Sequence, residues 1–405
     1  MFTYEIKLKK IGEMTTLADS QRLFGFLINY SKRYCAEEEI SSFVKGIREL
    51  KQKCMISSIM PTGYYPTPKE YILQKLQRRL NQNKEKIKVL EEEQIILKTK
   101  IVPLIENLKE KKNCKNKSTD KKSKEALNKE IRELKSEIEA IRKEFDKKAD
   151  DIYNLSPKNI YENLKQMDFV QQHQLKEFLH LGKTKGFLKV EELKKFRFLK
   201  KNQSFIQKFY LESQVKELPG IPNIAYSLPI FSFINQDKKI QKNFSFFVKV
   251  GENSCIAKAL EGMKSSLVER EISCFLGGKG SSGYNEYQIY NIEKSKENGG
   301  GEQLGANTNY LNLGVLLPNF DNIDLENSIL EIYTSDRKPF EIENEVSKVI
   351  SFVTSGSVIK IKDGCTDLYK VGESIDNSKY NPLYNKNTII FGNSYFVKLE
   401  VHDED

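Results

Sequence analysis

Two long stretches with apolar residues at alternating steps of three and four place the strongest constraint on how this chain folds. They cover residues 73–108 and 127–155. Such a repeat is the seam of a coiled coil, in which each helix buries one narrow apolar stripe against its neighbour. The stretch between them, 109–124, reads KEKKNCKNKSTDKKSK and is rich in lysine. We therefore expect an antiparallel coiled-coil hairpin over 69–155 with a lysine-rich tip.

The position of the tip predicts how the two arms pair. If the chain folds back within the lysine-rich stretch, Leu108 faces Leu127, and the pairing continues to Leu80 and Leu155. Pro103 lies inside the first arm. Because proline removes a helical hydrogen bond and clashes with the preceding turn, we expect it to kink or break the arm.

Two seam positions in the first arm are polar, Asn83 and Gln94. A polar seam residue commonly fixes register, and this is our interpretation of both. The tip lysines have two interpretations, a solvated loop or a site for an acidic partner. The formal net charge of +10 over 405 residues makes a polyanionic partner plausible without identifying it.

Outside the arms, alternation of apolar and polar residues predicts strands. Residues 2–8 alternate from the start of the chain. The runs 226–234 and 244–250 are predicted to form a hairpin with Lys238 and Lys239 near its turn. Further strands are expected at 310–317, 329–333, 349–353, 357–361 and 389–401.

Helical patterns cover two other segments. One extends from Ile160 to Leu179, and the other from Ile256 to Phe275, ending at a glycine-rich stretch. No apolar run approaches the roughly 20 residues that a membrane span requires. No signal peptide precedes the first strand, so we expect a cytoplasmic protein without membrane contact.

The cysteines and histidines support neither a metal site nor a cofactor. No C-x-x-C pair is present, and only three histidines occur, so we expect no metal, no cofactor and no disulfide framework. His173 and His180 lie seven residues apart without a ligand partner at metal-binding spacing, and we interpret them as structural. The cysteines are expected to be reduced and buried: Cys35, Cys54, Cys114, Cys255, Cys274 and Cys365.

The glycine-rich stretch GGKGSSGY, 277–284, contains a literal G-x-G-x-x-G. A dinucleotide fingerprint needs a strand before it and a helix after it, which is the reverse of the order predicted here. Lys279 stands in the wrong place for a P-loop. Two interpretations remain: a turn that needs glycine for its geometry, or exposed backbone amides that contact a sugar-phosphate chain without reading its sequence.

Several segments, in their order along the chain, resemble the RAMP superfamily of CRISPR proteins. CFLGGKGSSGYNEYQI, 274–289, resembles the glycine-rich loop of its RRM-like domain, and TLADSQRLFGFLINYSKRY, 16–34, resembles its first helix. MISSIMPTGYYPTPK, 55–69, resembles the segment that follows that helix. ILEIYTSDRKPFEI, 329–342, and VISFVTSGSVIKI, 349–361, resemble an arginine-containing turn and a strand of its second domain. Together these segments are most similar to the fourth Csm subunit family of type III-A effector complexes.

This resemblance implies an α+β fold with two ferredoxin-like, or RRM-like, domains. The coiled-coil hairpin is then an insertion in the first of them. The implied boundaries are 1–68 and 156–294 for the N-terminal domain with a thumb-like hairpin at 219–250, 69–155 for the insertion, 295–309 for a linker, and 310–405 for the C-terminal domain.

The resemblance also implies a non-catalytic role in antiviral defence. The family binds the 5′ tag of the guide RNA (crRNA), contacts the large polymerase-like subunit and a backbone subunit, and meets the target RNA indirectly. The residues implied to contact RNA are Gly277, Gly278, Lys279, Gly280, Ser281, Ser282, Gly283, Lys7, Lys9, Ser20, Arg22, Lys238, Lys239, Arg337, Ser355, Gly356 and Ser357.

Two alternatives stay open at this point. One is a metal-independent endoribonuclease that cleaves CRISPR repeat RNA, since processing nucleases share the superfamily and require a general acid or base such as histidine. Here His173 and His180 follow the coiled coil and His402 lies in an acidic tail, away from the early helix. The other is a coiled-coil interaction protein whose RNA-binding domain is vestigial.

Overall fold

The computed structural model describes residues 1–118, 120–184, 186–210, 224–296, 308–335, 350–376 and 389–399. The chain divides into two compact units. The first consists of residues 1–72, 166–180 and 197–405, and the second of 73–165 and 181–196. The second unit therefore includes 181–196 in addition to the helices of the predicted insertion.

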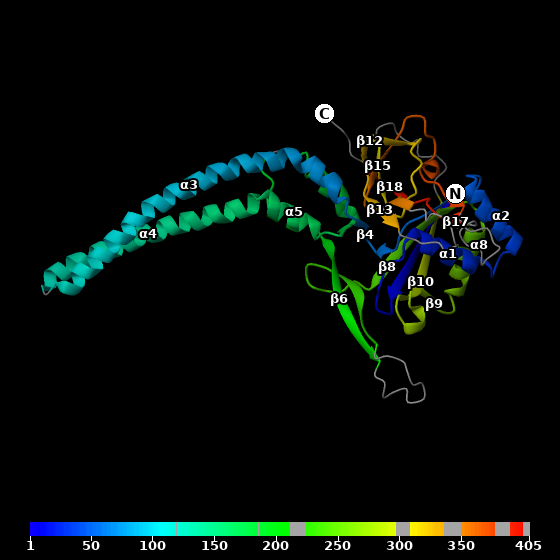
Figure 1. Cartoon of the computed structure of the whole chain (residues 1–405), viewed down its shortest axis with the longest axis horizontal. Helices are drawn as coiled ribbons and strands as arrows, with labels where there is room; N and C mark the ends of the chain where they lie inside the picture. The colour runs from blue at the N-terminus through cyan, green and yellow to red at the C-terminus, as the bar shows by residue number, and fades with distance from the viewer. Residues whose placement is uncertain are drawn as a thin grey trace. The chain divides into compact units, whose positions relative to one another are not determined.

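An antiparallel sheet forms the centre of the first unit (Figure 1). Its strand order is β2 (Cys54–Ile56), β8 (Asn243–Val250), β1 (Phe2–Lys10), β10 (Glu286–Lys296) and β9 (Ile272–Phe275), with β3 (Met60–Pro61) also paired to β8. The predicted first strand is confirmed as β1, in which Tyr4, Ile6 and Leu8 are fully buried.

Three helices accompany this sheet, α1 (Ser20–Ser31), α2 (Glu37–Arg48) and α8 (Cys255–Ser266). The Tyr4 hydroxyl on β1 donates to Glu261 on α8 at 2.8 Å, so α8 lies on the buried face of the sheet. The Asp19 side chain caps α1 by accepting from the Arg22 backbone N–H at 2.8 Å. Along the chain, the main elements around this sheet come in the order β1, α1, β2, β8, α8 and β10, with other elements between them. In space, the strands have the order β2-β8-β1-β10.

The predicted hairpin of 226–234 with 244–250 is wrong. Strand β7 (Ile224–Ile234) pairs with β6 (Phe198–Tyr210), and β8 pairs with β1 and β2 instead. The reason is that 198–210 shows no regular alternation of apolar and polar residues, so its sequence did not identify it as a strand. A smaller sheet continues through β6 to β5 (Phe169–Gln171) and β4 (Tyr64–Pro66).

Both predicted helical segments are shorter than expected. The 160–179 pattern divides into α5 (Pro157–Lys165), the strand β5, a 3₁₀ turn (Gln172–Gln174) and α6 (Leu175–His180). The 256–275 pattern ends in α8 at Ser266, and Phe275 belongs to β9. The glycine-rich stretch therefore connects two paired strands rather than a helix and a strand.

The C-terminal half of the first unit contains strands at the predicted runs, and two further strands that were not predicted, at Ile323–Ile329 and Ile375–Asp376. One sheet has the order β12 (Ile323–Ile329), β15 (Val358–Ile361), β11 (Asn309–Asn312) and β18 (Phe396–Leu399). Two strand pairs accompany it, β13 (Ile332–Ser335) with β14 (Ile350–Val353), and β16 (Ile375–Asp376) with β17 (Ile389–Ile390). The only helical element among the described residues from 308 to 399 is a 3₁₀ turn at Leu368–Val371. A second ferredoxin-like domain thus stays a prediction.

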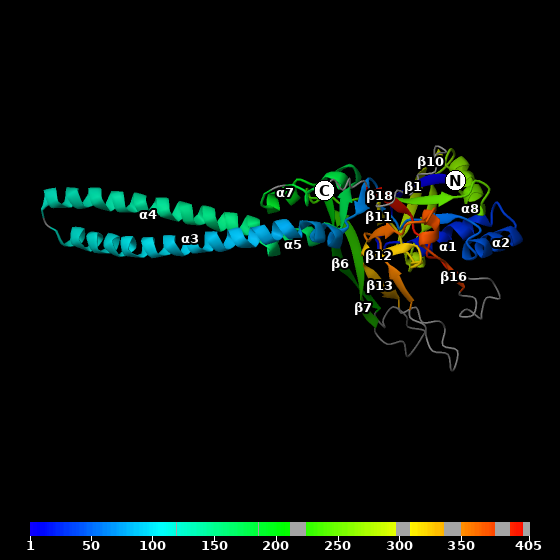
Figure 2. The ribbon, with the colours of Figure 1, turned by 90° about the horizontal axis from the view of Figure 1, so that it is seen from above.

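In the second unit, α3 (Lys69–Lys117) and α4 (Lys121–Leu155) run side by side in opposite directions, as Figures 1 and 2 show. Seam residues such as Leu76, Leu90 and Ile138 are buried as predicted. The helices continue through most of the predicted tip, since α3 ends at Lys117 and α4 begins at Lys121. Asp120 is the N-cap of α4, because its side chain accepts from the backbone N–H groups of Lys122 and Ser123, and α4 therefore begins within the predicted tip.

The register of the arms differs from the predicted one. Gln94 donates to the Phe145 carbonyl at 3.3 Å, and Lys148 pairs with Glu93. In the predicted register, Gln94 faces Ile141, so the true pairing lies about one helical turn further along α4. The shift follows from the late end of α3 at Lys117 and the start of α4 at Lys121. Helix α3 also continues unbroken through Pro103, so the predicted break is wrong.

The base of the second unit is held by two buried polar side chains on α3. Arg79 donates to the carbonyls of Leu181, Gly186 and Phe187 and pairs with Glu192 in α7 (Val190–Lys194). Asn83 donates to the carbonyls of Leu155 and Leu188 and accepts from the Leu188 N–H. Asn83 therefore fixes α3 against α4 and against the 181–196 segment together, which agrees with its predicted role in register.

Candidate nucleic-acid interface

Several strand ends of the central sheet meet at one edge. Strand β1 ends at Lys10, where Lys9 lies opposite Gln288 at the start of β10 and opposite Asn243 at the start of β8. The Lys10 N–H donates to the Lys242 carbonyl at 2.8 Å. The glycine-rich loop, which we define as 276–285, joins β9 to β10 at this same edge. The topology therefore places three features at one edge of the central sheet: Lys9, the turn before β8 and the glycine-rich loop.

The loop has a tightly defined backbone. The Ser282 N–H donates to the Lys279 carbonyl at 3.0 Å, and the Gly283 N–H donates to the Gly280 carbonyl at 2.9 Å, which closes a 3₁₀ turn over Gly280–Ser282. Lys279 and Gly283 flank this turn with φ of 62° and 77°. These left-handed conformations favour glycine at the second position and are tolerated by Lys279.

Most of the loop glycines are explained by the turn itself. A Cβ at Gly277 would lie 2.7 Å from the Asn285 amide nitrogen, and one at Gly280 would lie 3.1 Å from the Phe275 ring. The Gly283 carbonyl approaches Gly12 so closely that a Cβ on Gly12 would lie 2.1 Å from it. Gly278 differs, because a Cβ there would meet nothing within 4 Å. Turn geometry therefore accounts for three glycines and leaves Gly278 facing open space.

The same loop presents a run of unused backbone donors. Within the described part of the chain, the N–H groups of residues 277–281 have no hydrogen-bond acceptor. Gly278, Lys279 and Ser281 are exposed. Successive backbone amides in a turn of this kind form a concave site for an anion such as a phosphate group. The loop is thus both a glycine-dependent turn and an exposed set of amide donors.

Asn285 holds the loop in this shape. It is fully buried, with a left-handed φ of 56° that asparagine tolerates. Its amide nitrogen donates to the Gly278 carbonyl at 2.8 Å and to the Thr15 hydroxyl at 2.7 Å. Its amide oxygen accepts from the backbone N–H groups of Thr15 and Thr16. One side chain therefore ties the loop to the segment that leads into α1.

Lysine and aromatic side chains lie beside the loop on the β6–β7 ribbon. Lys279 lies over the Tyr226 ring at 5.4 Å, and Lys208 lies over the Tyr284 ring at 4.8 Å. Tyr226 is 38% exposed, and Phe275 next to the loop is 51% exposed. Cations near accessible aromatic rings suit a nucleic acid, since the cations meet phosphates and the rings stack on bases.

Comparison with known proteins gives matches among solved structures. No family model matches the chain, and no curated protein sequence matches it. The structure is similar to a chain of a crystal structure of the Csm1-Csm4 cassette in complex with cA4, at 12% identity and a TM-score of 0.44, with full coverage of both chains. It is also similar to a chain of the Csm3-Csm4 subcomplex of the type III-A CRISPR-Cas interference complex, at 13% identity and a TM-score of 0.39, covering 96% of this chain and 98% of the other.

These are the complexes to which the sequence resemblance pointed. A likeness at this level of identity and TM-score assigns neither an activity nor a ligand to the chain.

Some predicted RNA contacts lie at the loop edge. Lys9, Lys238 and Lys239 are exposed there, the latter two in the turn before β8, where Lys238 has a φ of 61°. Arg22 is exposed and donates to the Thr16 hydroxyl at 3.2 Å, beside the segment that Asn285 holds. Lys7 lies further along β1, and its ammonium pairs with Glu293. This pair holds the pKa of Lys7 above its ordinary value, chiefly through the Glu293 hydrogen bond.

Other predicted contacts lie elsewhere. Ser20 is fully buried, and its hydroxyl accepts from the Val315 N–H at 3.0 Å, so it connects α1 to the C-terminal half. Ser357 is buried and accepts from the Glu331 N–H, and Gly356 is also buried with a φ of 100°. Ser355 is half-buried and lines a cavity of about 190 Å³ with Asp19, Ser58, Phe169 and Thr354. Arg337 and the segment 297–307 of the predicted linker lie outside the described residues.

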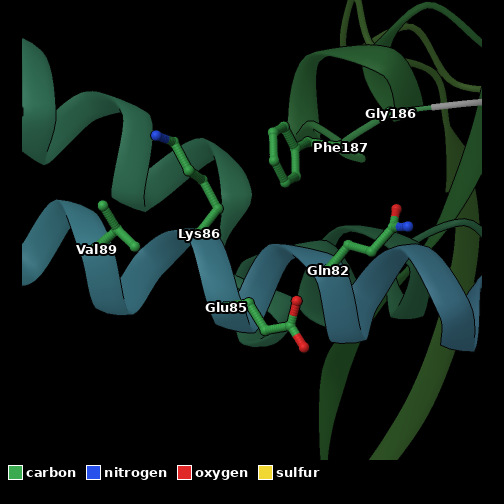
Figure 3. Close-up of a pocket in the computed structure, with 6 residues that line it drawn as sticks. All are labelled: Gln82, Glu85, Lys86, Val89, Gly186 and Phe187. Atoms are coloured by element: carbon green, nitrogen blue, oxygen red, sulfur yellow. The ribbon is translucent and has the colours of Figure 1, made fainter.

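A larger cavity, of about 450 Å³, lies in the second unit and is mostly apolar. In Figure 3, Phe187 faces α3 across the opening, with Gln82, Glu85, Lys86 and Val89 along the helix. Among the described residues that line this cavity there is no histidine and no cysteine. None of the described helices has the length and apolarity to cross a membrane.

Sequence reasoning missed three contributors to the interface, Asn285, Tyr226 and Lys208. Tyr226 and Lys208 were missed because β6 was not recognised as the partner of β7. Only the turn at Asn285 could have been predicted, because asparagine directly before a strand is typical of a turn residue with a left-handed backbone.

Proposed function

We propose that this chain is a non-catalytic RNA-binding subunit of a type III-A CRISPR effector complex that holds the 5′ tag of the guide RNA at the loop edge. The observation that carries the proposal is the run of five exposed or half-exposed backbone amides at 277–281 that lack acceptors within the described chain. Amides bind a phosphate without reading a base, which suits a tag of constant sequence held by its backbone.

The surroundings of the loop support the same ligand. Lys9, Lys279 and Lys208 supply positive charge, and Tyr226 and Phe275 supply accessible rings. The sequence segments at 16–34 and 274–289, which resemble the RAMP superfamily, supply α1 with its preceding turn and the loop itself, and Asn285 joins them. The resemblance and the geometry therefore converge on one edge of the molecule.

The β6–β7 ribbon takes the place of the predicted thumb in this proposal. It is a two-stranded element of 11 paired positions between Lys200–Tyr210 and Ile224–Ile234. We propose that it reaches the guide–target duplex. Contacts to the large polymerase-like subunit and to a backbone subunit are part of the same proposal and follow from the sequence resemblance.

The test measures binding of the purified chain to a labelled RNA that begins with the repeat-derived tag, with a scrambled RNA and a DNA of the same sequence as controls. We expect tag-RNA binding that weakens as salt rises. The slope of log affinity against log salt should fall by about one in Lys279→Ala, since one phosphate contact is lost. Since the amides read no base, the scrambled RNA should bind through this loop about as tightly as the tag RNA, and an unchanged salt slope in Lys279→Ala would contradict the phosphate contact.

The same samples discriminate the endoribonuclease. His173 lies exposed in a 3₁₀ turn and His180 ends α6, and neither joins a general-acid geometry at the loop. Cleavage of repeat RNA without metal, lost in His173→Ala or His180→Ala, would overturn the non-catalytic role. An unmodified protein that binds no RNA at low salt would leave the coiled-coil interaction protein as the better assignment.

A further inference from the structure

Two cysteines and one glutamate that are far apart in the sequence meet near the other end of the central sheet. Cys35 lies in the turn after α1, Glu39 in the first turn of α2, and Cys255 is the first residue of α8, shortly after β8 ends at Val250. Their two sulfur atoms and a carboxylate oxygen all lie within 4.8 Å of one another. Because β8 begins at the loop edge, this cluster is distinct from the candidate nucleic-acid interface.

Hydrogen bonds and close packing hold the backbones of Cys35 and Cys255 in place. The Ser31 hydroxyl bonds the Leu27 carbonyl at 2.8 Å and the Cys255 carbonyl at 3.2 Å, which joins the end of α1 to the start of α8. The Cys35 N–H donates to the Ser31 carbonyl at 3.0 Å. Tyr34 packs so closely on α8 that a Cβ at Gly262 would lie 2.2 Å from its ring.

The charges around the cluster suit a divalent cation. Lys258 donates to Glu39 Oε1 at 2.5 Å, and a carboxylate oxygen of Glu39 lies within 4.8 Å of both sulfur atoms. Two thiolates and a carboxylate carry three negative charges, which a divalent cation and the Lys258 ammonium together neutralise. A hydrogen bond from a neighbouring group to a ligating carboxylate is the usual way in which proteins orient such a ligand.

We propose that Cys35, Cys255 and Glu39 bind one thiophilic divalent cation of the zinc type. Zinc binds sulfur at about 2.3 Å, so two ligating sulfurs stand roughly 3.8 Å apart, within the span that the cluster already has. Binding replaces the two S–H protons, which leave to solvent, and water fills the fourth position. Cys35 is half-buried and opens the site to solvent, whereas Cys255 is only 2% exposed.

Sequence spacing could not predict this site, because no two of its ligands form a metal-binding motif. The sequence-based expectation of no metal rested on the absence of C-x-x-C pairs and on the small number of histidines. The ligands come together only when the turn after α1 packs on α8.

The test uses the full-length reduced protein and Co²⁺ as the probe, because thiolate-bound tetrahedral Co²⁺ absorbs in the near ultraviolet and the visible. We expect one Co²⁺ per chain, displaced by Zn²⁺. Cys35→Ser should abolish the thiolate absorption, and Glu39→Gln should weaken binding. Cys114→Ser and Cys365→Ser are the matched controls, since these cysteines are exposed and half-buried at other places in the fold.

Two results would overturn the proposal: no thiolate-to-cobalt absorption in the unmodified protein, or undiminished absorption in Cys35→Ser. Cys35 is preferred to Cys255 for this purpose because a half-buried position tolerates serine without unfolding. Lys258→Met should weaken Co²⁺ binding by roughly 10- to 100-fold, as loss of an orienting partner does. Tighter binding in that variant would show that Lys258 competes with the cation and would overturn its neutralising role. RNA binding is measured separately and does not depend on the outcome.

Discussion

The amide nitrogen of Asn285 donates to the carbonyl oxygen of Gly278 at 2.8 Å. This bond fixes one peptide group of the glycine-rich loop, and the neighbouring N–H groups have no acceptor within the described chain. Because Asn285 also bonds Thr15 and Thr16, the loop and the approach to α1 share one anchor. The shape of the proposed phosphate site therefore depends on a residue that the ligand does not touch.

Replacement of Asn285 by Asp should loosen the loop without abolishing the fold. Aspartate keeps the acceptor for the Thr15 and Thr16 N–H groups and tolerates the left-handed backbone, but it loses the two donors. Leaving the Gly278 carbonyl and the half-buried Thr15 hydroxyl without this donor should cost about 1 kcal/mol. We expect a lower Tm together with weaker tag-RNA binding.

The informative control for Asn285→Asp is Asn291→Asp, an asparagine on β10 that bonds Glu293. That variant adds the same charge and should bind RNA nearly as well as the unmodified protein. Full RNA affinity in a folded Asn285→Asp protein would show that loop shape is irrelevant to binding.

Gly278→Asp should weaken RNA binding much more than Lys279→Ala. Gly278 has room for a side chain, so the aspartate brings its carboxylate beside the amide run without disturbing the turn. Like charges in contact cost several kcal/mol, so a loss on the order of tenfold or more is expected, whereas removal of one lysine costs less. Binding is followed by fluorescence anisotropy at fixed salt.

Gly278→Ala separates bulk from charge and should bind almost normally. Gly280 is a poorer position for the same experiment, because its Cβ would press on Phe275 at 3.1 Å and alter the turn. If Gly278→Asp and Gly278→Ala bind tag RNA equally well, the loop is only a turn.

The sequence predicted the coiled coil well because its signal is local and repeated. Apolar residues at steps of three and four identify the seam over about ten helical turns. The tip was predicted too early in the chain, and this one error displaced the predicted register of the two helices by about one turn. Asn83 was correctly interpreted as a register residue, but its partner Leu188 lies far along the chain and could not be foreseen.

The candidate interface was only partly predictable, because it depends on strand pairing. The loop was identified from its glycine content, and Lys9 was implied by the family resemblance. The ribbon residues were missed, since a polar strand such as 198–210 has no strong pattern of its own and gains its identity from β7. Ser20 and Ser357 were placed at the surface by resemblance, yet both hydroxyls bond backbone N–H groups in the interior.

Glu331→Gln should stabilise the protein at neutral pH. Burial, with the nearby Glu70 charge, raises the pKa of Glu331 above its ordinary value of 4.5 in the folded state. The folded state therefore binds the proton more tightly than the unfolded state, and the ionised side chain is a penalty that appears as the pH rises above 4.5. Glutamine removes that penalty.

The gain in Tm of Glu331→Gln over the unmodified protein should accordingly grow between pH 5 and pH 8 and vanish toward acid pH. Glu326→Gln, at an exposed position on β12, is the control and should show no such trend. A Tm difference that is constant with pH would mean that the ionisation of Glu331 carries no penalty.

The distal part of the arm should be removable without loss of the fold or of RNA binding. Arg79 and Asn83 bind the 181–196 segment, so a deletion that includes them would leave Leu188 and Val190, which are fully buried, without cover. A cut after Leu90 avoids this. Since Glu93 pairs with Lys148, residues 91–149 can be replaced by a short Gly/Ser linker across two helices roughly 8 to 10 Å apart.

This distal deletion should give a soluble monomer whose tag-RNA affinity lies within about twofold of that of the full chain, because the loop, Asn285 and the ribbon all belong to the first unit. Gel filtration and anisotropy measure the two properties. The longer deletion of 72–152 serves as the contrast and should lower the Tm or aggregate. A distal deletion that stays folded and monomeric yet binds no RNA would place part of the RNA-binding surface on the arm, and the lysine-rich tip would then be the first segment to mutate.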